Sequence, residues 1–195
     1  QSVSEALRVN YRLSPGQLNI PLNQGDGLLT LEKALSGIKF GDFNVRIIGP
    51  AKAELDRLRI EWDAWLKKSK KAVKELRDQA REDGAELTND YDRFSRYLSL
   101  AQEIFGDRTK VTTPNLASLM LLAEAKGKRI LLTGDGHADD ILSGLESLAL
   151  LKAGGKIHVD VLKVPHHASE HNTTREFVQR VSANHYIFCG NGKHE

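Results

Sequence analysis

The chain lacks the features that mark secreted or membrane-bound proteins. Its single cysteine, Cys189, cannot form an internal disulfide, which fits a reducing compartment but also a secreted protein without bridges. No stretch resembles a signal peptide, and no apolar run is long enough to span a bilayer. These absences predict a cytoplasmic protein that does not contact membranes.

A strong net charge is also absent. The 28 Lys and Arg residues oppose 26 Asp and Glu residues, which leaves a net charge of +2. Charge alone therefore does not predict binding to nucleic acid or to a membrane surface, although a small basic groove stays possible. At 195 residues the chain can bury the core of one domain, or of a domain with an insertion.

Histidine is missing from the first two thirds of the chain. The seven histidines are His137, His158, His166, His167, His171, His185 and His194. Any chemistry is therefore expected after Asn115.

The middle of the chain predicts a helical hairpin. FNVRIIGP, at 43–50, alternates and ends in Gly-Pro, as a strand would. Residues 51–83 contain neither Gly nor Pro, and apolar residues such as Leu58, Trp62 and Trp65 recur at helical spacing. A second helix is predicted at 88–106. We interpret residues 51–110 as a helical insertion between strands.

The charged face of the helix at 51–83 has two possible meanings. Its KKSKK run, at 67–71, could contact nucleic acid, but flanking acidic residues favour a solvated helix face. Trp62 and Trp65 predict a packing seam, against the body of the protein or against a partner helix. A protein partner is therefore possible on this helix.

The last third of the chain predicts alternating strands and helices. A β-hairpin with a Lys-Gly turn is expected at 118–135, and a strand at 157–164. The segment 139–155 predicts a helix with carboxylates in its first turn, Lys152 in its last turn and Gly154 beyond its end. A helix at 173–183 and a strand at 185–190 follow. This order predicts a layered α/β protein.

Two groups of polar residues directly follow predicted strands. Asp135 lies between Gly134 and Gly136, which let the backbone turn without a Cβ, and His166 and His167 follow Pro165. Neighbouring strand ends converge on one edge of a sheet, where α/β proteins place their sites. Carboxylate and imidazole suit ions such as Zn²⁺, Mn²⁺ or Fe²⁺. Taken alone, however, the Asp could be only a helix cap, and the His pair could face solvent.

Four motifs in order resemble the C-terminal half of a metallo-β-lactamase-fold hydrolase. They are Asn-x-x-Ser-Leu at 115–119, Leu-Thr-Gly-Asp at 132–135, Pro-His-His-Ala-Ser at 165–169 and Gly-Asn-Gly-Lys-His at 190–194. The likeness is greatest to the subgroup that includes the hydrolase domain of bacterial DNA-uptake channel proteins. Ala168 stands where that family usually has Gly. The resemblance implies that residues 1–195 form one partial domain of an αββα sandwich.

The resemblance also implies roles for individual residues. Asp135 would bridge two divalent ions, zinc or manganese, and His167 would bind the second ion. His166 would be a neighbouring or substrate-facing catalytic group, and His194 a further metal ligand. A metal-bound hydroxide would attack an ester or phosphodiester, in a small molecule or a nucleic acid, of which nucleic acid is less favoured.

The family's main metal motif, His-x-His-x-Asp-His, is absent from the 195 residues, as is its next single His ligand. We therefore expect the chain to be a piece of a longer metallo-hydrolase, and to be nearly inactive by itself. One alternative is a non-catalytic module that binds a partner through the Trp62 and Trp65 helix. Another is a DNA nuclease, for which strong salt dependence would be expected.

Overall fold

The computed structural model describes residues 9, 12–20, 27–32, 37–68, 70–71, 74, 107–108, 111–169 and 171–190. Residues 66, 107, 108 and 167 are described by their backbone alone. The chain divides into two compact units, one of residues 1–28 and 59–106, the other of residues 29–58 and 107–195. The second unit contains the sheet and the candidate site, and most of the description concerns it.

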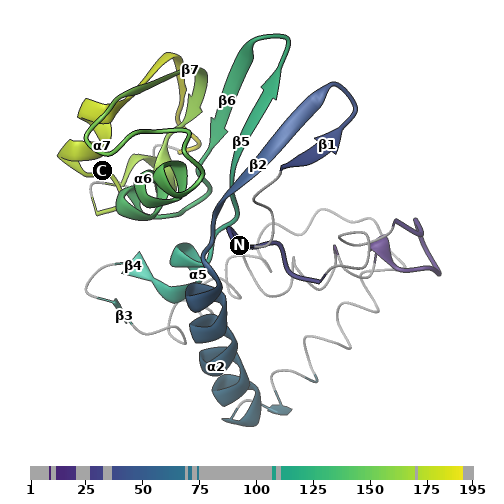
Figure 1. Cartoon of the computed structure of the whole chain (residues 1–195). Helices are drawn as coiled ribbons and strands as arrows, with labels where there is room; N and C mark the ends of the chain where they lie inside the picture. The colour runs from purple at the N-terminus through teal and green to yellow at the C-terminus, as the bar shows by residue number, and fades with distance from the viewer. Residues whose placement is uncertain are drawn as a thin grey trace. The chain divides into compact units, whose positions relative to one another are not determined.

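A six-stranded mixed sheet forms the centre of this second unit, as Figure 1 shows. Its order is β1 (Ile38–Phe40), β2 (Phe43–Gly49), β5 (Met120–Ala125), β6 (Lys128–Leu132), β7 (Ile157–Lys163) and β8 (Val181–Ile187). The first four strands pair antiparallel, whereas β6, β7 and β8 run parallel. The C-terminal ends of β6 and β7 therefore lie at the same edge of the sheet.

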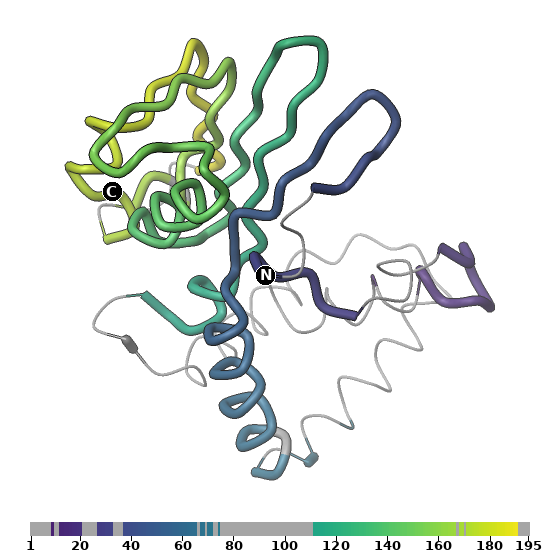
Figure 2. Tube along the Cα trace, in the orientation of Figure 1, coloured from purple at the N-terminus to yellow at the C-terminus, as the bar shows by residue number. Residues whose placement is uncertain are grey.

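The predicted β-hairpin and the strand before the helical segment are confirmed. β2 occupies 43–49, and β5 and β6 pair in register with Leu122 opposite Leu131. Lys126 and Gly127 form the turn, and both have positive φ, 50° and 74°. Two such residues match the right-handed twist of a hairpin. The β1–β2 and β5–β6 hairpins can be followed side by side in Figure 2.

The core lies between the sheet and two helices, α6 (Ala138–Ser147) and α7 (Arg175–Arg180). Leu122, Leu131 and Leu162 lie opposite one another across β5, β6 and β7, and all three are buried. Ile141 and Leu145 of α6, which are four residues apart, join this row in the same apolar cluster. Burial of each such side chain contributes about 1.5–3 kcal/mol.

Helix α6 approaches the sheet so closely that one position has no room for a side chain. A Cβ at Gly144 would overlap the carbonyl oxygen of Ile48, at the end of β2. The helix N-terminus is placed by the cap residue His137, whose Nδ1 accepts a hydrogen bond from Asp139 N at 3.3 Å. The start of the helix thus agrees with the sequence prediction.

The predicted end of this helix, at Lys152, is wrong. Helix α6 ends at Ser147, because Ala149 adopts a left-handed conformation with φ of 54°. Leu150 N then donates to Leu145 O at 2.9 Å, which closes the helix in the manner usually associated with glycine at that position. The glycine that marks a helix end in many sequences is replaced here by an alanine, and Gly154 belongs to a later turn.

The predicted boundary between the last helix and the last strand is also wrong. Helix α7 ends at Arg180, and β8 starts at Val181, where the sequence predicted helix. Val181 is buried and pairs with Ile157, so strand pairing prevails over the helical pattern. The predicted capping by a threonine is confirmed, since Thr174 Oγ1 accepts from Phe177 N at 3.2 Å.

Arg180 ties α7 to the loop that follows α6. Its guanidinium donates to the carbonyl oxygens of Lys152 and Gly155, each at 2.9 Å, and to the carboxylates of Glu146 and Glu176. The hydrogen bond with Glu146 is the main cause of the raised pKa of Arg180. A nearly buried cation is tolerated here because its donors are paired.

The predicted helical insertion is described only in part. Helix α2 (Lys52–Lys68) starts where the sequence predicted a helix, and its first residues belong to the sheet unit. The predicted helix at 88–106 lies outside the described residues, so the bounds 51–110 stay a prediction.

Short pieces complete the described chain: β3 (Asp107–Arg108), β4 (Val111–Thr112) and α5 (Thr113–Leu116). In the described part of the chain, no helix has the length and apolar character needed to cross a membrane.

These elements make the chain an α/β protein with a six-stranded mixed sheet and, among the described residues, four α-helices. The predicted fold class is thereby confirmed at this level. The narrower prediction, half of an αββα sandwich, stays a prediction.

The contact at Gly144 gives a test of the packing. We predict that Gly144→Ala lowers the free energy of unfolding by about 1–3 kcal/mol, because the added methyl group forces α6 away from β2. Ser143→Ala is the matched control, since Ser143 is the exposed neighbour in the same helix. Urea denaturation of both variants measures the difference; equal midpoints would contradict the close packing.

Candidate functional site

The end of β6 is fastened to the end of β7 by a buried hydroxyl. Thr133 is fully buried, and its Oγ1 donates to Lys163 O at 2.6 Å. Gly134 follows with φ of 54°, and a Cβ there would come within 3.0 Å of Ser118 Cβ. Gly136 has a different constraint, because a Cβ would overlap the sulfur of Met120. Asp135 therefore lies in a turn that requires glycine on both sides of it.

Asp135 lies in this turn, with both its backbone and its carboxylate engaged. Its N–H donates to Ser118 Oγ at 3.2 Å, and its Oδ1 is 3.5 Å from Lys163 Nζ. Lys163 Nζ also donates to Gly134 O. The Asp135 side chain keeps 26 % of its surface exposed and that of Lys163 keeps 16 %. The Asp135 carboxylate is therefore partly exposed to solvent and has the Lys163 cation beside it.

The end of β7 turns sharply through a short 3-10 helix, η2 (Pro165–Ala168). His166 has φ of 40° and Ala168 has φ of 70°, backbone values that residues other than glycine rarely adopt. His166 N donates to Gly134 O at 3.3 Å, so this turn is bonded to the turn that holds Asp135. Non-glycine residues in such conformations gather at functional sites.

The imidazole of His166 contacts two asparagines from different parts of the chain. Its Nδ1 is 2.7 Å from Asn172 Oδ1, and the amide nitrogen of Asn115 is 3.4 Å from each ring nitrogen. Asn115 belongs to the same short helix region, α5, that precedes Ser118. Residues 115–118 thus reach both turns, one through an amide and one through a hydroxyl.

Asn172 joins the two turns through its side chain. The side chain is fully buried, and Nδ2 donates to Asp135 O at 3.0 Å and to Gly136 O at 3.3 Å. Its backbone carbonyl also accepts from Ala138 N at 2.9 Å, at the start of α6. With the bond to His166, one residue connects the Asp135 turn, the His166 turn and a helix.

The predicted site residues have different outcomes. Asp135 and His166 lie in two hydrogen-bonded turns at the ends of adjacent parallel strands, as expected. The backbone of His167 lies in η2, but its side chain lies outside the described residues, and so does all of His194. The assignments of His167 and His194 as metal ligands stay predictions.

A metal centre cannot be completed from the described residues. Among them, no group of three or more His, Cys, Asp and Glu side chains is placed to hold an ion. Asp135 and His166 are the donors that the fold brings to this edge of the sheet. His137, by contrast, caps α6, and His171 lies in an exposed turn.

Four residues of the site were not predicted as functional. Lys163 reads as the last residue of a strand, and Asn172 as one polar residue in a polar loop. The signal for Asn115 and Ser118 was present, since both belong to the Asn-x-x-Ser-Leu motif, but spacing alone does not show which strand end they reach. Their roles depend on the folding of segments that are far apart in sequence.

Comparison of the chain with protein-family models, with curated proteins and with solved structures finds no match.

The strained turn after β7 gives a second prediction. We expect Ala168→Gly to raise the free energy of unfolding by up to about 1 kcal/mol, because glycine tolerates positive φ without the Cβ clash. Ala153→Gly is the control: Ala153 lies in an exposed turn with ordinary φ, so the same change should lower stability by about 0.5–1 kcal/mol. Thermal unfolding measures the stability of both variants. An equal loss of stability in the two would contradict a strained conformation at Ala168.

Proposed function

We propose that the chain provides part of the catalytic centre of a metal-dependent hydrolase that acts on an ester or a phosphodiester. The main support is the convergence of three separate motifs. Ser118 bonds to Asp135, Asn115 contacts His166, and the Asp135 and His166 turns bond to each other. Segments around residues 115, 133 and 166 would not need to converge on one carboxylate and one imidazole if they served only the core.

The donors at this edge fit a zinc or manganese ion in their chemistry. Asp135 offers a partly exposed carboxylate, and His166 offers an imidazole whose Nδ1 is already hydrogen-bonded by Asn172. Metal-ligating histidines nearly always hydrogen-bond through the ring nitrogen that does not bind metal. Asp135 and one of His166 and His167 would hold the metal, and His166 has the hydrogen bond expected of a ligand.

The residues around the donors have distinct parts in the proposed reaction. Divalent ions held there would activate water as a nucleophile and offset charge on the leaving oxygen. Lys163 orients the Asp135 carboxylate and carries a positive charge that favours a phosphate or carboxylate group of a substrate. The turn at Gly134 and Gly136 places Asp135 directly after β6, where its carboxylate is partly exposed.

On this proposal the complete centre also needs the His-x-His-x-Asp-His motif of the family, which is not among these 195 residues. On this proposal the isolated chain binds metal weakly and turns over little. A single carboxylate and one imidazole leave two of the four coordination positions of a tetrahedral zinc ion to water.

The interaction-module alternative rests on one contact. Trp62 and Trp65 of α2 lie with ring centroids 5.1 Å apart and planes tilted by 32°, an arrangement in which each ring packs against the other. The two rings pack against each other within one helix, so the pair does not require a partner protein, and we favour the hydrolase. The nuclease alternative differs from the proposed hydrolase only in its substrate.

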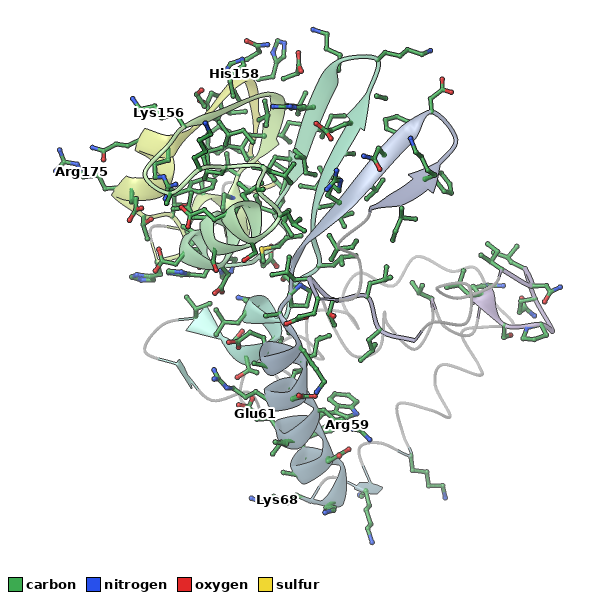
Figure 3. The ribbon with its side chains drawn as sticks, viewed as in Figure 1. Arg59, Glu61, Lys68, Lys156, His158 and Arg175 are labelled. Atoms are coloured by element: carbon green, nitrogen blue, oxygen red, sulfur yellow. The ribbon has the colours of Figure 1, made fainter. Side chains whose placement is uncertain are left out.

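Metal titration tests the proposed centre. In calorimetric titrations with Zn²⁺ and Mn²⁺, we predict one weak site that is weakened at least roughly tenfold in Asp135→Ala and in His166→Ala. His158→Ala is the control, because His158 lies at the start of β7 (Figure 3), whereas His166 follows the other end of that strand. Equal affinity in all four proteins would exclude Asp135 and His166 as ligands.

Activity is tested on the full translated product of the gene that encodes this chain. If that product contains a His-x-His-x-Asp-His motif, we predict chelator-sensitive hydrolysis of bis(p-nitrophenyl) phosphate or p-nitrophenyl acetate that Asp135→Ala and His167→Ala abolish. A product without the motif, or rates unchanged in both variants, would contradict the proposal and favour the interaction module. For the nuclease alternative, DNA cleavage over a salt series is the corresponding assay.

A further inference from the structure

We propose that Asn172 is a positioning residue that holds the neutral His166 ring in the Nδ1–H tautomer, with Nε2 as the nitrogen that carries a lone pair. The tautomer follows from hydrogen bonds within the chain. Its use, as a metal ligand or a proton acceptor, rests on the proposed function.

The orientation of the Asn172 amide is determined by its backbone partners. The amide nitrogen lies 3.0 Å from Asp135 O and 3.3 Å from Gly136 O. Carbonyl oxygens only accept hydrogen bonds, so the NH₂ group must face them and the amide oxygen must face away. Turning the amide over would place an oxygen against two carbonyl oxygens in a fully buried position.

The His166 ring then has one permitted arrangement. Its Nδ1 is 2.7 Å from Asn172 Oδ1, which can only accept, so Nδ1 must carry the proton. In a neutral imidazole the second nitrogen is then an acceptor. The amide of Asn115 lies equally far from both ring nitrogens, at 3.4 Å, so it does not select between them.

The same residue also fixes the ring relative to Asp135. Asn172 bonds the backbone of Asp135 with one end of its amide and the imidazole with the other. The carboxylate and the lone pair of Nε2 thus belong to two turns that a single rigid amide spans. Precise placement of this kind is what a catalytic pair requires of its supporting residues.

His158 provides an internal comparison within the same chain. Its Nε2 is 3.1 Å from Asn184 Oδ1 and its Nδ1 is 3.0 Å from Ser182 Oγ. Here the oxygen faces Nε2, and the hydroxyl can donate to Nδ1. We therefore expect His158 in the Nε2–H tautomer, opposite to that of His166.

Long-range ¹H–¹⁵N correlation spectra of the ¹⁵N-labelled chain test this inference directly. The spectra are recorded in alkaline buffer, and the two tautomers of a neutral imidazole give different patterns in them. The signal that disappears in His166→Gln identifies His166. We predict Nδ1–H for His166 and Nε2–H for His158; Nε2–H for His166 in the unaltered chain would overturn the proposal.

Two variants then test the part played by Asn172. In Asn172→Ala the His166 ring should lose its preference for Nδ1–H. Asn172→Asp keeps an acceptor and should keep that tautomer, with a loss of stability because its second oxygen faces the carbonyl oxygens of Asp135 and Gly136. Asn184→Ala is the matched control and should leave His166 unchanged. If Asn172→Ala folds, as judged by its backbone amide spectrum, and His166 keeps Nδ1–H, the proposal is wrong. If neither Asn172 variant folds, the spectrum of the unaltered chain still decides.

A second readout separates this inference from the proposed function. If both are right, Asn172→Ala weakens Zn²⁺ binding by about 10- to 100-fold, as loss of a ligand-supporting hydrogen bond typically does. If His166 has the predicted tautomer but the unaltered chain binds no Zn²⁺, the positioning role stands and the metal assignment fails. If Zn²⁺ binds and the tautomer is Nε2–H, the metal assignment stands and the positioning role fails.

Discussion

The arrangement of the candidate site depends on one buried side chain, that of Asn172. Strands β6 and β7 run parallel, so the loops that leave them start at the same edge of the sheet. Strand pairing alone places those loops near each other without fixing the groups in them. The amide of Asn172 supplies that constraint by bonding two carbonyl oxygens of one loop and the imidazole of the other. Because the amide is fully buried, its donors and its acceptor must all be satisfied, and that requirement makes the geometry specific.

The rest of the fold supports this constraint through close backbone approach. Thr133 bonds the ends of the two strands, and Gly134 and Gly136 leave room for Ser118 and Met120 beside the Asp135 turn. Gly144 lets α6 lie against β2, and the start of this helix is bonded to Asn172 through Ala138 N. Small residues therefore occur where the backbone must pass close to another segment, and the polar residues of the site lie between them.

The sequence is sufficient to predict elements that have local signals. It is insufficient where contacts between distant residues determine the end of an element or the role of a residue. The Lys-Gly turn between β5 and β6 and the start of α6 have local causes, and both were predicted correctly, although the His137 cap was not. The ends of α6 and α7 were wrong because Ala149 takes a conformation typical of glycine and because Val181 pairs with Ile157. In the site, Asp135 and His166 could be selected by their place after strands. Lys163 and Asn172 could not, because each of them bonds to the Asp135 turn, which lies 28 residues from Lys163 and 37 from Asn172 along the chain.

The proposed hydrolase centre joins the motif resemblance to this geometry, and its central claim is that Asp135 and the histidines after β7 bind one metal centre. A crystal structure of the chain grown with Zn²⁺, with diffraction recorded at the zinc edge, tests that claim most directly. The account predicts an anomalous peak about 2.0–2.2 Å from a carboxylate oxygen of Asp135 and from a ring nitrogen of His166 or His167. A peak elsewhere, or no peak beside Asp135 under those conditions, would contradict it.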